Sequence, residues 1–133
     1  MQETIAFTIN AIHKSFLAHT AQILKNHGLN HGQLPFILYI GKHPGCAPSE
    51  LKSDLKLDWG YSQRAITKLV EHGYITKTLD SRSDKYQLEL TETGTCAFHA
   101  CHDAFAQWDN EHLKNLTCQE QEELLHLLQQ IPL

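Results

Sequence analysis

The chain has 133 residues, a hydrophobic fraction of 41% and a net charge of −4, which is ordinary for one soluble globular domain. The first residues carry no secretory signal, and the densest apolar run, residues 36–40, is far too short to span a membrane. Four cysteines beside a normal share of Leu, Ile and Phe do not indicate a disulfide scaffold, so we expect a cytoplasmic protein.

The first expected element is a long amphipathic helix over residues 4–27, ended by Gly28. Its apolar residues recur at intervals of three, four or seven: Ile5, Ile9, Ile12, Phe16 and Ile23. A second helix is expected over residues 30–42, with Pro35 tolerated only because it lies in or near the first turn. Residues 43–45, His-Pro-Gly, then break the helix.

Two further helices and a hairpin are expected next. A short helix over residues 48–55 opens with a proline, and a longer helix over residues 59–71 is followed by a glycine stop. Two strands are expected over residues 74–79 and 86–90, because polar and apolar residues alternate in the second. The intervening residues 80–85 are all polar, as at the tip of a hairpin.

The chain is expected to end in two more helices. Thr91 is placed to cap a long helix that runs to about residue 113. Thr117 and Glu120 then form the Thr-x-x-Glu pattern of a capping box before a leucine-rich final helix. The prediction is a mainly α fold with a small β-wing, in a single domain over residues 1–133.

Two helices joined by a tight turn and followed by a hairpin with a basic tip make a winged helix-turn-helix. The DNA major groove accepts one helix, so the second helix of the pair must present side chains to base edges. The candidate DNA-binding residues are Ser49, Tyr61, Ser62, Gln63, Arg64, Lys68, Arg82 and Lys85. Residues 52–85 hold seven of the 11 Lys and Arg residues and five acidic ones, a local net charge of +2 that favours phosphate binding.

Residues 29–94 resemble the multiple-antibiotic-resistance regulator (MarR) family, and the likeness continues into the flanking helices. The matching stretches are His43-Pro44-Gly45, Ser49-Glu50-Leu51, Ile66-Thr67-Lys68-Leu69-Val70-Glu71-His72-Gly73-Tyr74-Ile75, Asp80-Ser81-Arg82 and Leu90-Thr91-Glu92-Thr93-Gly94. The resemblance implies a winged helix-turn-helix core over residues 29–94 and dimerisation helices over residues 4–26 and 95–133. It also implies a homodimer that represses an operon from a palindromic operator until a ligand or a stress signal releases it.

The sequence departs from this family at the start of the expected recognition helix. The family commonly has a proline and small hydroxyl residues there, whereas this chain has Trp59, Gly60 and Tyr61. In the wing, Lys85 stands where arginine is frequent, which keeps the charge but not the bidentate phosphate geometry. The base contacts, and with them the operator sequence, therefore cannot be carried over from the family.

Ten histidines and four cysteines raise the alternative of a metal- or redox-sensing member of the same fold. Cys96, His99 and His102 are candidate metal ligands at helical spacing, although their pattern is not a closed zinc motif. Cys46 and Cys118 are candidate redox thiols, because a helix N-terminus at Cys118 would favour the thiolate. Surface or interface histidines and buried cysteines are the competing interpretations of the two sets.

A third kind of signal is a small-molecule effector. His13, Phe105 and Trp108 are expected to line a pocket between the first, second and fifth helices, although core and interface packing explain them equally well. No nucleophile elbow, P-loop or Gly-rich dinucleotide turn is present, so we expect neither an enzyme nor an organic cofactor. A winged-helix module that binds proteins instead of DNA is the second function class, and the salt dependence of duplex binding separates the two.

Overall fold

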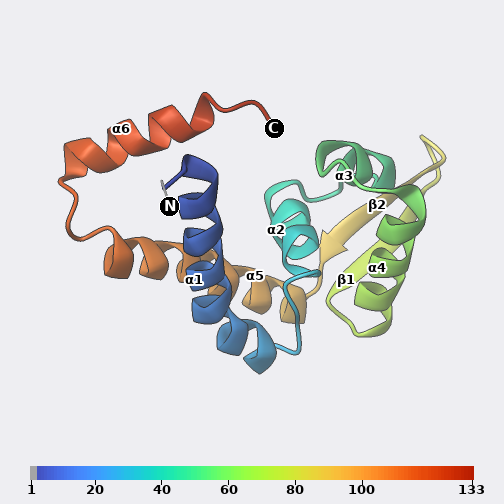
Figure 1. Cartoon of the computed structure of the whole chain (residues 1–133). Coiled ribbons are helices and arrows are strands. Elements are labelled where there is room, and N and C mark those ends of the chain that lie inside the picture. Colours follow the sequence, from blue (N-terminus) through green and yellow to red (C-terminus); the bar gives the residue numbers. More distant parts are fainter. Residues whose placement is uncertain (1–2) are drawn as a thin grey trace.

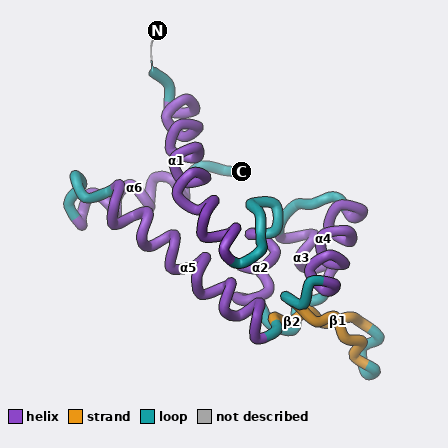
Figure 2. The backbone as a smooth tube through the Cα atoms, turned by 90° about the horizontal axis from the view of Figure 1, so that it is seen from below, coloured by secondary structure: helices purple, strands orange, loops and turns teal. Residues whose placement is uncertain are grey.

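The computed structural model describes residues 3–133 and places a long helix across the base of the molecule, with a winged lobe at one end (Figure 1). In chain order the elements are α1 (Ile5–Asn26), α2 (Leu34–Lys42), α3 (Pro48–Asp54), α4 (Trp59–Glu71), β1 (Ile75–Asp80), β2 (Lys85–Leu90), α5 (Glu92–His112) and α6 (Cys118–Gln129). The antiparallel β1–β2 hairpin projects beyond the helices beside α4 (Figure 2). The expected mainly α fold with a small β-wing is confirmed.

The second helix is the one element whose start differs clearly from the sequence prediction. α2 begins at Leu34, four residues later than the expected start at residue 30. Pro35 explains the difference, because a helix extended backwards would bring its ring against the carbonyl of His31. Instead, Asn30 and Gln33 close a turn in which each side chain accepts a hydrogen bond from the other's backbone N–H, at 3.0 and 3.1 Å.

The expected helix stops and caps are confirmed. Gly28 and Gly73 have φ angles of +70° and +80°, the left-handed conformation that suits a glycine after a helix. The side chain of Thr91 caps α5, and Thr117 forms a full capping box at the start of α6. Asp58 caps α4 in the same way, with its carboxylate accepting a hydrogen bond from the backbone N–H of Tyr61.

The core lies where α2, α4 and α5 meet the base of the hairpin. Its largest fully buried side chains are Phe36, Leu24, Ile37, Ile40, Leu51, Ile66, Leu69, Ile75 and Leu88. At the edge of this core, the Tyr39 hydroxyl donates a 2.5 Å hydrogen bond to Asp54 and thereby joins α2 to α3. That hydrogen bond, together with burial, raises the pKa of Tyr39 to about 12, so the hydroxyl remains a donor at neutral pH.

The terminal helices leave broad apolar surfaces uncovered. In the first half of α1, Ile5 is 76% exposed and Phe7 is 53% exposed, and α6 buries none of its residues. A hollow of about 470 Å³, lined mainly by apolar side chains, separates α6 from α1 and α5. Between residues 3 and 133 no helix has the combination of length and apolarity that a membrane span requires.

Candidate nucleic-acid interface

α4 has one face in the core and one face in solvent, and this register determines which side chains are free to bind. Ser62, Ile66 and Leu69 are completely buried, at intervals of four and three residues. The residues exposed on the opposite side of the helix are Arg64, Thr67, Lys68 and Glu71. Thr67 was not among the predicted DNA-binding residues, although its spacing of three residues from Arg64 places both on the same face.

The prediction that Ser62 contacts DNA is wrong. Its side chain is completely buried, and its hydroxyl donates a 3.0 Å hydrogen bond to the backbone carbonyl of Trp59 in the preceding turn. Tyr61 is 43% exposed, but its ring also packs against Phe36 of α2, with the ring centroids 6.2 Å apart. Tyr61 therefore lies on the α2 side of α4, at the margin of the exposed face.

Gly60 makes room for the side chain of Arg64. A methyl group on Gly60 would lie 3.2 Å from Nη1 of Arg64 and 3.3 Å from Oδ2 of Asp58. The Arg64 guanidinium thus folds back along the helix toward its first turn, where Gly60 presents no side chain of its own. This arrangement leaves the guanidinium exposed close to the N-terminus of α4, the end of a recognition helix that meets base edges.

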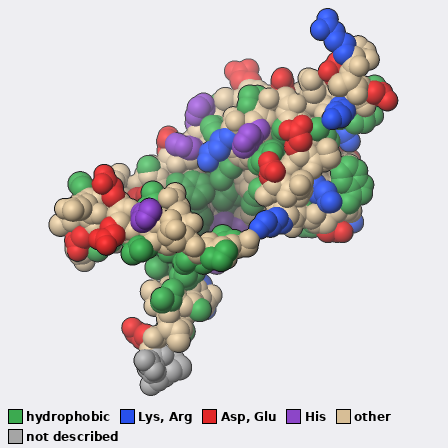
Figure 3. Space-filling model, turned by 90° about the horizontal axis from the view of Figure 1, so that it is seen from above, with side chains coloured by type: hydrophobic (Ala, Val, Ile, Leu, Met, Phe, Trp, Pro, Cys, Tyr) green, Lys and Arg blue, Asp and Glu red, His purple; other side chains and the backbone are tan. Residues whose placement is uncertain are grey.

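The wing is ordered by the side chain of Asp80. Its carboxylate accepts hydrogen bonds from the backbone N–H of Arg82 and from the Ser83 hydroxyl, both at 3.0 Å. Arg82 contributes only its backbone N–H to these hydrogen bonds, so its side chain remains exposed at the tip. The side chain of Lys85 is exposed there as well. Figure 3 shows Lys and Arg side chains at this projecting tip and along the winged lobe, interspersed with acidic side chains, and further acidic side chains at the opposite end of the molecule.

A hollow of about 500 Å³ opens between the start of α3, the first turn of α4 and the wing. Three predicted DNA-binding residues, Ser49, Gln63 and Lys85, line it together. Lys77 also lines it, with its ammonium 4.6 Å above the centre of the Tyr86 ring, a favourable cation–π geometry. The structure therefore brings Ser49 of α3, Gln63 of α4 and two wing lysines to one hollow, which Asp84 also lines.

The predicted metal site on α5 is wrong. Cys96, His99 and His102 are all exposed, and within residues 3–133 no three His, Cys, Asp or Glu side chains are arranged to hold a metal ion. A spacing of three residues places side chains on one helix face, but a metal cage requires ligands that converge from several directions. No second element supplies them along the part of the chain that the structure describes.

The predicted redox role of Cys46 is also contradicted. Cys46 is 5% exposed and forms an isolated β-bridge with Leu88, which holds it beneath the base of the wing. Burial, and to a smaller extent the charge of Glu50, raises the pKa of the Cys46 thiol to about 11. The thiol is therefore protonated at neutral pH. Cys118 is exposed at the first position of α6, and its redox role stays a prediction.

We expect iodoacetamide to alkylate Cys46 about two orders of magnitude more slowly than Cys96 or Cys118 at pH 8, because roughly 0.1% of a thiol of that pKa is thiolate. Raising the pH toward 11 should accelerate labelling of Cys46 in the folded protein. Peptide mass spectrometry after timed quenching measures the three rates. Equal rates for Cys46 and Cys118 at pH 8 would show that Cys46 is not protected as the structure requires.

The structure does not bring the predicted effector-binding residues together. Phe105 stacks on Phe16 with ring centroids 4.9 Å apart, and the crevice they share between α1, α2 and α5 has no room for a water-sized molecule. His13 is exposed, and Trp108 lines the separate hollow beneath α6. On its other side, Phe105 borders a separate hollow of about 360 Å³ that lies along α2 and includes Leu38 and Tyr39 in its lining.

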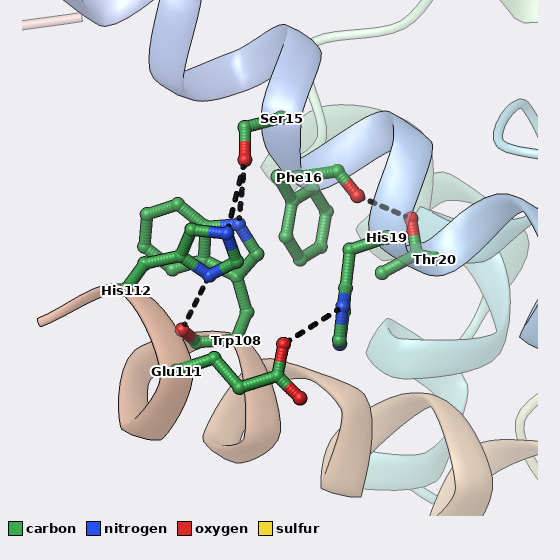
Figure 4. Close-up of polar contacts among 7 residues, drawn as sticks. All are labelled: Ser15, Phe16, His19, Thr20, Trp108, Glu111 and His112. Carbon is green, nitrogen blue, oxygen red and sulfur yellow. Dashed lines mark hydrogen bonds and ion pairs between the residues drawn. The ribbon is translucent and has the colours of Figure 1, made fainter.

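Trp108 belongs instead to a polar cluster that fastens α1 to α5 (Figure 4). Its indole N–H donates to the hydroxyl of Ser15 at 3.3 Å, and the ring of His112 stacks on the indole with centroids 4.5 Å apart. One turn along α1, His19 lies 3.7 Å from a carboxylate oxygen of Glu111. Two of the ten histidines, His19 and His112, therefore serve to pack α1 against α5.

Comparison with known proteins extends these observations. No protein-family model matches the chain. It is 32% identical to the HTH-type transcriptional regulator BilQ of Clostridium symbiosum (strain WAL-14163), over 98% of this chain and 92% of that protein. A solved MarR transcriptional regulator from Methanosarcina mazei Go1 is 25% identical with a TM-score of 0.82, over 97% of this chain and 87% of the other. A MarR family regulator from Listeria monocytogenes, solved with a 26mer DNA, has a TM-score of 0.83 and 23% identity over the same shares of the two chains.

Proposed function

Since this chain belongs to the MarR family of helix-turn-helix transcriptional regulators, we propose that it is a homodimeric repressor. In this proposal it binds a palindromic operator and releases it in response to a ligand or a stress signal. The observation that carries the proposal is the hollow in which Trp59 and Gln63 of α4 lie beside Lys77 and Lys85 of the wing, on a chain whose net charge is −4. Its relatives are named transcriptional regulators, which supports a non-enzymatic role for this chain in the cytoplasm.

The proposed division of labour on DNA follows the geometry of the winged lobe. α4 enters the major groove, where Arg64 can pair with guanine and Gln63 with adenine. Lys68, one turn beyond Arg64, is placed to contact a phosphate. Arg82 and Lys85 of the wing reach the adjacent minor groove or its phosphates.

The proposed dimer explains the uncovered terminal helices. Monomers seldom leave contiguous apolar surface larger than a few hundred Å² exposed. We therefore infer that a second copy of the chain covers the apolar side chains of α1 and α6. We assign residues 4–26 and 95–133 to dimerisation and residues 29–94 to DNA binding, within one domain. A two-fold axis would present two α4 helices to successive major grooves about 34–36 Å apart, which matches a palindromic operator.

Replacing Arg64 by Ala is expected to broaden sequence preference, whereas replacing Arg82 by Ala is expected to weaken binding evenly across sequences. A lost bidentate contact to guanine costs about 1–3 kcal/mol of discrimination between bases. A lost phosphate contact lowers the slope of log affinity against log salt concentration by about one. The measurement is fluorescence anisotropy between 50 and 200 mM salt, with duplexes selected by the wild-type protein from a random library. Unchanged affinity and preference in Arg64→Ala would refute the placement of α4.

The same titration tests the function itself. A repressor that neutralises several phosphates loses duplex affinity steeply as salt rises. Wild-type protein that binds no duplex in a salt-dependent manner, and selects no sequence from the library, would instead favour a winged-helix module that binds proteins.

A further inference from the structure

Trp59 is the largest uncovered side chain on the winged lobe. It is the first residue of α4 and remains 51% exposed. Its side chain lines the 500 Å³ hollow between α3, α4 and the wing, together with Gln63 and Lys85. Trp59 therefore lies where the proposed recognition helix meets the wing, on the flank of α4 away from Tyr61 and α2.

An exposed indole at this place would be stabilised by contact with an apolar group of the DNA, because the contact removes apolar surface from water. Lys77 and Lys85 line the same hollow together with one acidic residue, Asp84, so the lining keeps a net positive charge that attracts the phosphate backbone toward this surface. The largest apolar group on the base edges of the major groove is the 5-methyl group of thymine, which projects into the groove. That methyl group is the base group that best matches the exposed Trp59 indole.

Gln63 strengthens the assignment, because it lies one helical turn after Trp59 and lines the same hollow. Glutamine can hydrogen-bond to N6 and N7 of adenine, the partner of thymine. We infer that Trp59 and Gln63 together read A·T pairs, with the Trp59 indole packed on a thymine methyl and Gln63 bonded to the adenine of the same or the next pair. This inference rests on the proposed function of DNA binding.

The experiment replaces thymine by deoxyuridine, which removes only the methyl group. Duplexes are first selected from a random library with the wild-type protein, and each thymine of the selected site is then substituted singly. Affinities are measured for the wild type, Trp59→Ala, Trp59→Lys and the control Val70→Ala. Val70 is an exposed apolar residue of α4 about 16 Å farther along the helix axis.

At one or more positions the wild type and Val70→Ala should bind the thymine duplex about fourfold more tightly than the deoxyuridine duplex, the value of one buried methyl group. For both Trp59 variants this ratio should fall to one. Trp59→Lys keeps a long side chain and adds a charge that can bind phosphate. It therefore provides a second test of the thymine-to-deoxyuridine affinity ratio if circular dichroism shows that Trp59→Ala folds poorly.

Two results would overturn the inference while leaving DNA binding intact. One is an unchanged thymine-to-deoxyuridine ratio in both Trp59 variants, which would place the indole on the sugar-phosphate backbone. The other is a selected site in which no thymine substitution affects the wild type. A wild-type protein without salt-dependent duplex binding would overturn the proposed function and, with it, this inference.

Discussion

Replacing Leu125 by Asp is expected to convert the proposed dimer into a monomer and to weaken binding to the proposed operator at least about 100-fold. Leu125 is 56% exposed on α6 and lines the apolar hollow beside α1 and α5. A carboxylate there would have to be buried without a partner when a second copy of the chain covers this surface, which is strongly unfavourable. Loss of the dimer then removes the avidity of two linked half-site contacts, which is typically worth 10²- to 10⁴-fold.

The matched control for this change is Gln119→Asp, which adds the same charge near the start of α6 on another face of the helix. It should sediment and bind as the wild type does. Sedimentation velocity at low micromolar concentration gives the oligomeric state, and anisotropy on the selected duplex gives the affinity. A well-folded wild-type monomer, or a Leu125→Asp variant that remains a dimer, would count against the proposed interface.

Replacing Gly94 by Ala is expected to lower the free energy of unfolding by about 3 kcal/mol or more. A Cβ atom on Gly94 would lie only 2.0 Å from the carbonyl oxygen of Tyr74. That oxygen already accepts a 3.0 Å hydrogen bond from the backbone N–H of Thr91, whose side chain caps α5 through the N–H of Gly94. Because the obstructing atom belongs to the backbone, α5 could accommodate the methyl group only by moving away from the wing.

Thr93→Ala is the control, since Thr93 is the exposed neighbour of Gly94 in the same helical turn. Its change in stability should stay within the few tenths of a kcal/mol typical of surface substitutions. Urea unfolding followed by circular dichroism compares the two variants. If Gly94→Ala unfolded at the same urea concentration as Thr93→Ala, the close junction between α5 and the wing would be absent in solution.

The sequence by itself determined the order and the boundaries of the elements, because the signals that set them act within a few residues. Gly28 and Gly73 end helices through their own φ angles, and Thr91 and Thr117 begin helices through N–H groups three residues away. α2 was the exception, since helical periodicity before Pro35 could not show that a turn would replace the first helical residues. The wing was equally local, built from alternation and a polar tip.

The chemistry of individual side chains was decided only by tertiary structure, because it depends on groups distant along the chain. Ser62 was expected on the exposed face of α4, but the packing of that helix places it in the core. Cys46 is buried because it pairs with Leu88, which lies 42 positions farther along the chain. The stacking of Phe16 on Phe105 closed the crevice that the sequence left open for an effector. Periodicity states which residues share a face, whereas burial, pKa and cavity volume depend on what packs against that face.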